Sequence, residues 1–133
     1  MRENEALKNP RVIVIQKLYG HYLNKENELI FPKHRYKKFI KDVVNGTIER
    51  KDLIQNLIDT ELKEDINENK TELMLKLMIM AAIYEFMFMH KTPIKVVINE
   101  YLKVADFFVQ GSQKSFLNVI LDKVSKISRH KGV

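Results

Sequence analysis

The run LMLKLMIMAAIYEFMFM, residues 73–89, constrains the fold of this chain more than any other segment. Only Lys76 and Glu85 interrupt its apolar side chains, so a helix formed by it has no polar face. Such a helix belongs in the middle of a bundle, and this one is too short and too charged to span a membrane. Its methionines could form an adaptable groove, but methionine at this density usually fills gaps in a core. We therefore predict a central core helix.

Helical spacing recurs on both sides of this run. It is carried by Ile15, Leu18, Tyr19, Tyr22 and Leu23, by Tyr36, Phe39, Ile40, Val43 and Val44, and by Ile94, Val97, Ile98, Tyr101, Ala105 and Phe108. Helix starts are expected at Asn9-Pro10, Thr47, Thr71, Thr92-Pro93 and Ser112, and Gly46 is expected to end the second helix. No segment alternates long enough to require a strand. We predict an all-α, compact domain over residues 1–133, with six to seven helices in two three-helix subdomains.

The charge of the chain is positive and unevenly distributed. The net charge is +6 overall. Residues 1–45 carry a net +5, residues 46–75 carry −4, and residues 76–133 carry +5. Two basic regions permit an anionic partner such as nucleic acid, but a solvated basic surface would have the same composition. The absence of cysteine excludes disulfides and thiolate chemistry and suits a reducing cytoplasm.

Catalytic and metal-binding patterns are missing from the sequence. The four histidines show no metal-ligand spacing, and there is no glycine-rich phosphate loop, G-x-S-x-G or HExxH motif. Glu85 and Glu100 lie in apolar helices and could form an acid–base pair, but we expect them to be satisfied structural carboxylates. The residues predict no catalytic site, no metal and no cofactor.

Several segments, in this order and at these intervals, resemble the NusB family of bacterial transcription antitermination factors. They are QKLYGHY (16–22), FIKDVVNG (39–46), AIYEF (82–86), TPIKVVINEYLKVADFF (92–108) and SFLNVILDK (115–123). The resemblance covers about residues 8–129 and implies a compact all-α fold of two helical subdomains. It also implies binding of boxA RNA in nascent ribosomal RNA transcripts, together with NusE, a ribosomal protein of the small subunit. The wider partner would be the RNA polymerase antitermination complex. The protein itself would be a cytoplasmic monomer or weak homodimer without membrane contact.

The resemblance also implies a set of RNA-binding residues. The family's arginine-rich start is reduced here to Lys8 and Arg11, with Arg2 further out, and Tyr19 matches the tyrosine of its first helix. The resemblance assigns Lys114, Phe116, Asn118 and Asp122 to the family pattern K-F-x-N-x-x-x-D, with Lys114 two residues before the ring. Val119, Met80 and Leu75 depart from the family's usual glycine, arginine and acidic residue. With so few arginines, we expect weak RNA binding that NusE strengthens.

Phe116 is the residue on which the site prediction depends. It lies on the flank of the apolar stripe of its helix, so the ring could simply close the edge of the core. A half-exposed ring near Lys114 and Asn118 could instead stack on an RNA base, with the lysine on a phosphate and the amide on a base edge. The resemblance favours the second interpretation.

Two other functions remain open at this stage. The chain could be a helical protein-binding adaptor that has kept the fold while its RNA binding has weakened. It could also be the NusB-like domain that precedes a ribosomal RNA cytosine methyltransferase, which would require a longer protein with a methyl-donor domain.

Overall fold

Helix α5 (Leu73–Phe88) is the centre of the fold, as the sequence predicted. The computed structural model describes residues 6–67 and 71–131. Within them α5 contacts each of the other five labelled helices, and eleven of its sixteen residues are buried. Its methionines are core residues: Met78, Met80 and Met87 are buried and Met74 packs against the core.

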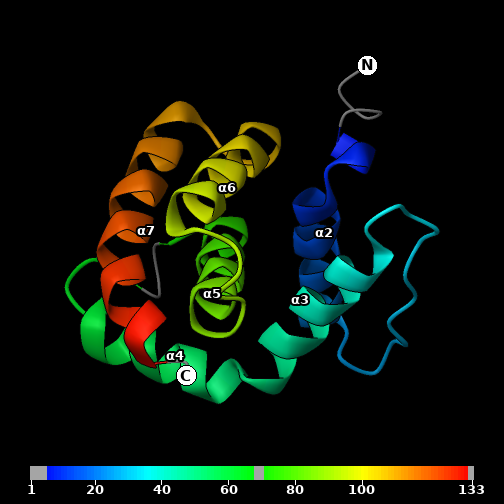
Figure 1. Cartoon of the computed structure of the whole chain (residues 1–133), viewed down its shortest axis with the longest axis horizontal. Coiled ribbons are helices and arrows are strands. Elements are labelled where there is room, and N and C mark those ends of the chain that lie inside the picture. Colours follow the sequence, from blue (N-terminus) through cyan, green and yellow to red (C-terminus); the bar gives the residue numbers. More distant parts are fainter. Residues whose placement is uncertain (1–5, 68–70, 132–133) are drawn as a thin grey trace.

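The other helices form two groups around α5 (Figure 1). The first group is α2 (Pro10–Leu23), α3 (Lys37–Glu49) and α4 (Lys51–Glu61), and the second adds α6 (Ile94–Phe108) and α7 (Gly111–Lys131) to α5. Within the second group every helix contacts both others, while α3 contacts α2 and α4. The described residues contain no strand. The all-α architecture predicted from the sequence is therefore confirmed.

The start of α2 follows the local sequence signal. The Asn9 side chain accepts a hydrogen bond of 3.0 Å from the backbone N–H of Arg11, and Pro10 occupies the first helical position. The cap satisfies one of the helix's unpaired N–H groups, and proline lacks the N–H that would be unpaired there. This turn directs the Arg11 side chain into the interior, which matters for the site below.

The prediction that Gly46 ends the second helix is wrong. Helix α3 continues through Gly46 to Glu49, so the next helix begins at Lys51 rather than at Thr47. A Cβ atom at Gly46 would lie 2.1–2.3 Å from ring atoms of Tyr84 on α5. The glycine is therefore explained by the close approach of α3 to the Tyr84 ring, not by a helix terminus.

Three other predicted helix starts are displaced by one or two residues. Helix α5 begins at Leu73, two residues after Thr71, and α6 begins at Ile94 with Pro93 rather than Thr92 at the capping position. Helix α7 begins at Gly111, so Ser112 lies inside its first turn. There the Gln113 side chain accepts a hydrogen bond from the backbone N–H of Gln110, so Gln113 and not Ser112 supplies the side-chain cap.

Candidate nucleic-acid interface

The first turns of α7 carry most of the predicted RNA-binding residues. Phe116 is half-buried and packs against the core. With Leu75 and Glu72 at the start of α5 and Asp65 in the preceding connection, it lines a hollow of about 280 Å³. Part of the ring therefore closes the core, and part of it faces an open surface hollow.

The two carboxylates that line this hollow are already paired. Lys123 forms an ion pair of 2.6 Å with Asp65, and Gln113 donates a hydrogen bond of 2.5 Å to Glu72. These two contacts attach α7 to the connection before α5 and to its first turn. They were not predicted from the sequence, because the partners lie far apart along the chain. The carboxylates beside Phe116 therefore each have a partner.

Lys114, Asn118 and Asp122 lie on the other flank of α7. Successive residues of a helix are rotated by about 100° around its axis. These three residues are spaced by four positions and therefore share a face, whereas Phe116 is about 160° around the axis from Lys114. Lys114 forms an ion pair of 2.8 Å with Asp106 of α6, and Asp122 lies 3.3 Å from Lys126. The structure therefore separates Phe116 from Lys114 and Asn118 by the width of the helix. The expected cluster of ring, lysine and amide does not form on one face.

Arg11, another predicted RNA-binding residue, lies inside the protein. Its Nε and Nη2 atoms donate hydrogen bonds of 2.9 and 2.7 Å to the two carboxylate oxygens of Glu85, which is fully buried. Tyr101 donates a third hydrogen bond to Glu85, and the Arg11 guanidinium lies 4.7 Å from the centre of the Phe39 ring. Glu100 approaches Arg11 to 3.9 Å. The guanidinium is thus occupied within the fold, and both glutamates face it as structural carboxylates.

The electrostatics of this cluster follow from burial and pairing. Burial alone would lower the pKa of Arg11, but the hydrogen bond and the charge of Glu85 outweigh it and raise this pKa above its usual value. Burial, followed by the negative charge of Glu85, raises the pKa of Tyr101 well above that of a free tyrosine. The cluster therefore holds a charged arginine and a neutral tyrosine. A sequence signal existed, since burying a glutamate in an apolar helix is costly unless the carboxylate is paired or hydrogen-bonded.

The remaining predicted residues lie near α2. Lys8 is exposed before α2, and Arg2 lies outside the described residues. Tyr19 is exposed on α2, with Tyr22 and Leu23 exposed beside it, at 37%, 55% and 63%. These three side chains form an apolar surface of a kind that often contacts another macromolecule.

Two further properties apply to the part of the chain that the structure describes. No group of histidine, cysteine or carboxylate side chains in it is arranged to hold a metal ion. No helix there is both long enough and apolar enough to cross a membrane.

Comparison with known proteins gives a consistent result. The sequence profile of the NusB family matches residues 8–126. The transcription antitermination protein NusB of Rickettsia akari (strain Hartford) is 34% identical over 86 residues, covering 65% of this chain and 55% of that protein. The corresponding protein of Rickettsia bellii (strain OSU 85-389) is 28% identical, with 86% of both chains covered.

The alignments differ in how much of each relative they span. Against the proteins of R. akari and of Rhodopseudomonas palustris (strain BisB18), the chain spans only about half of the relative's length, 55% and 52%. A solved structure of T. maritima NusB superimposes with a TM-score of 0.77 over 90% of this chain and 89% of that one, at 23% identity. That similarity shows a shared fold. The family profile matches most of this chain, and the helical architecture is shared with a solved NusB structure. This chain therefore belongs to the NusB family.

Proposed function

We propose that this chain is a transcription antitermination factor that binds boxA-type RNA of nascent ribosomal RNA transcripts together with NusE. The observation that carries the proposal is Phe116, a half-buried ring at the start of α7, within the segment FLN that matches the F-x-N part of the family pattern. Single-stranded RNA is bound by stacking its bases on aromatic rings of this kind. Membership of the family supports the same function.

The separation of Phe116 and Lys114 determines how an RNA strand must lie. A strand that contacts both residues crosses the first turn of α7 rather than following one face of the helix. The N-terminus of α7 supplies exposed N–H groups and the positive end of the helix dipole there, which favours phosphate. The Lys114–Asp106 pair is solvent-exposed and therefore contributes little, so Lys114 can turn to a phosphate. Arg11 has no place in this binding mode, because its guanidinium is held by Glu85.

Two variants of α7 test the proposal. Stacking contributes about 1–3 kcal/mol per base, so Phe116→Ala should weaken boxA RNA binding by roughly ten- to a hundredfold. Lys114→Ala should cause a smaller loss, equal for boxA and scrambled RNA, with a shallower salt dependence. Val119→Ala removes an exposed side chain of the same helix and serves as the control. A folded Phe116→Ala protein with a lower melting temperature and unchanged RNA affinity would show that the ring only closes the core.

The exposed face of α2 supports the protein-binding component of the function. Tyr19, Tyr22 and Leu23 expose apolar surface on one helix, which suits a protein partner better than a phosphate backbone. If this face binds NusE, Leu23→Asp should reduce NusE binding and leave the weak binding of RNA to the isolated chain unchanged. If the chain is only a protein-binding adaptor, boxA and scrambled RNA should bind equally weakly in the presence of NusE.

A further inference from the structure

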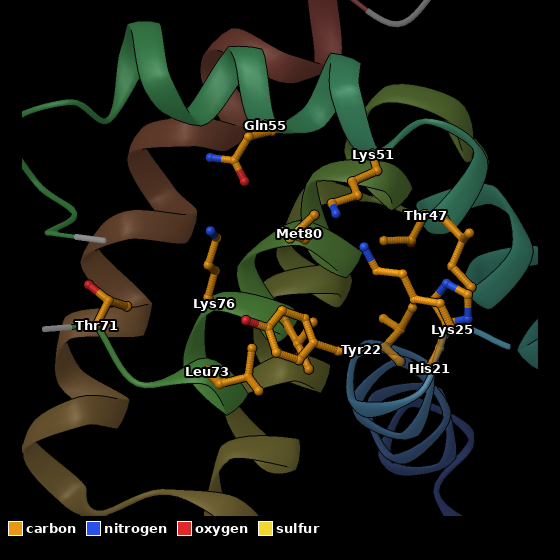
Figure 2. Close-up of a pocket in the computed structure, with 13 residues that line it drawn as sticks. His21, Tyr22, Lys25, Thr47, Lys51, Gln55, Thr71, Leu73, Lys76 and Met80 are labelled. Carbon is orange, nitrogen blue, oxygen red and sulfur yellow. The ribbon is translucent and has the colours of Figure 1, made fainter. Parts of the chain in front are cut away.

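A hollow of about 680 Å³ opens between α2, α3, α4 and α5, and the proposed function gives it no ligand. Figure 2 shows its lining side chains, which come from all four helices, from Lys25 after α2 and from Thr71 before α5. Only Thr71 also borders the smaller hollow beside Phe116. A volume of this size is in the range that binds small organic ligands.

Several basic side chains line this hollow. Its lining includes Lys25, Lys51, Lys76 and His21, and no aspartate or glutamate is among the described residues that form it. In the view of Figure 2 the side chains of Lys25 and Lys51 extend into the same space from opposite walls. Both residues are exposed to solvent, and their charges give the hollow a positive potential that attracts anions.

Lys25 and Lys51 also lack partners within the protein. Neither side chain forms a hydrogen bond or ion pair with any residue that the structure describes, whereas the side chains of Lys103, Lys114 and Lys123 are each paired with a carboxylate. Two ammonium groups that face one cavity repel each other. An anion bound between them relieves that repulsion and satisfies their donors.

The rest of the lining is suited to an apolar ring. Leu73, Leu77 and Met80 of α5 and the Tyr22 ring of α2 provide a wall of apolar and aromatic surface. On the α3 side, Thr47 lines the hollow, and its buried hydroxyl has no hydrogen-bond partner in the described part of the protein. An unsatisfied buried hydroxyl costs about 1–3 kcal/mol, so its presence at this wall calls for a partner from outside the chain.

We propose that this hollow binds a small organic phosphate of nucleotide size. The phosphate lies between the ammonium groups of Lys25 and Lys51, and the ring packs against Tyr22 and the α5 wall. Lysine binds phosphate as a compact point charge, and the apolar wall adds the affinity that an inorganic anion cannot gain. The site does not include Phe116 or Lys114, the residues proposed to contact RNA, and it shares Tyr22 with the exposed face of α2.

The test uses the full chain, isotope-labelled for NMR, and titrations with AMP, adenosine and inorganic phosphate. AMP should shift the backbone amide signals of Thr47 and Lys51, with a Kd at least about tenfold lower than that of adenosine or of inorganic phosphate. Equal affinity for AMP and adenosine would overturn the proposal, and so would equal affinity for AMP and inorganic phosphate.

Two variants test whether the ligand binds in this hollow. Lys25→Gln and Lys51→Gln should each weaken AMP binding by about tenfold, as expected for the loss of a charge-assisted hydrogen bond. Lys51 is the first residue of α4, where a positive charge opposes the helix dipole, so its removal should not unfold the protein. Lys95→Gln, which removes an exposed lysine of α6, is the control of equal charge and should leave AMP binding unchanged.

Three further results would overturn the proposal. They are an AMP affinity unaffected by both variants, an equal loss in the Lys95→Gln control, and amide shifts caused by single-stranded oligoribonucleotides but not by AMP. The last result would assign the hollow to an RNA surface instead of a nucleotide site.

Discussion

Replacing Arg11 by alanine would leave the Glu85 carboxylate inside the protein without a cation. Glu85 is fully buried, and two of its three hydrogen bonds come from Arg11, at 2.9 and 2.7 Å. Removing one partner of such a buried pair typically costs about 3–5 kcal/mol, because the remaining charge is uncompensated. We therefore expect Arg11→Ala to lower the free energy of unfolding by about that amount, measured by urea denaturation with far-UV circular dichroism.

A triple variant separates the charge effect from simple loss of packing. Arg11→Met with Glu85→Leu removes both charges at similar volume, and Tyr101→Phe removes the hydroxyl that would otherwise lose its acceptor. The triple variant should recover most of the stability that Arg11→Ala loses. Lys114→Ala, which breaks an exposed pair, is the control and should cost less than about 1 kcal/mol.

The same variants decide whether Arg11 contacts RNA. Because its guanidinium is held internally, the folded triple variant should bind boxA RNA as tightly as the unaltered protein. The reasoning would be refuted if Arg11→Ala cost no more than the Lys114→Ala control. A stable triple variant with strongly reduced RNA affinity would show that Arg11 leaves Glu85 to meet the RNA.

Other predictions concern the core and its pH dependence. Gly46→Ala should destabilise the protein by about 1–3 kcal/mol in thermal melts, since the added methyl group collides with Tyr84. Gly20 has open space around it, so Gly20→Ala should stabilise the protein by up to about 1 kcal/mol. Equal effects of the two variants on stability would contradict this prediction. Ile83→Ala should cost about 2–5 kcal/mol in urea denaturation, and a loss under about 1 kcal/mol would mean that α5 is peripheral. Because the pKa of Tyr101 is raised in the folded protein, its contribution to stability is complete below pH of about 10 and falls by about 1.4 kcal/mol per pH unit above it. Tyr101→Phe should therefore flatten the alkaline decline in stability, and an unchanged slope would refute the assignment.

The features that the sequence predicted well are those encoded locally or by periodicity. The apolar run of α5 has no polar face, so burial at the centre was the only stable solution in water. The Asn9-Pro10 signal is complete within three residues, and it formed as expected. The half-buried position of Phe116 followed from its place on the flank of an apolar stripe.

The features that were missed depend on contacts between distant segments. The sequence predicts a helix end at Gly46, because nothing nearby in the sequence indicates that Tyr84 packs against it. It also predicts Arg11 on the RNA surface, because its partner Glu85 belongs to another helix. The separation of Lys114 from Phe116 is different, since the rotation of about 100° per residue already places them on opposite flanks.

The most direct test of the proposed function is a titration of this protein with boxA and scrambled RNA, with and without NusE, at several salt concentrations. We expect weak binding by the chain alone, with a shallow salt dependence because few cationic side chains meet the phosphates. NusE should raise the affinity for boxA RNA strongly and that for scrambled RNA much less. Affinities that NusE leaves unchanged, or that are equal for the two RNAs in its presence, would contradict the proposed role in antitermination.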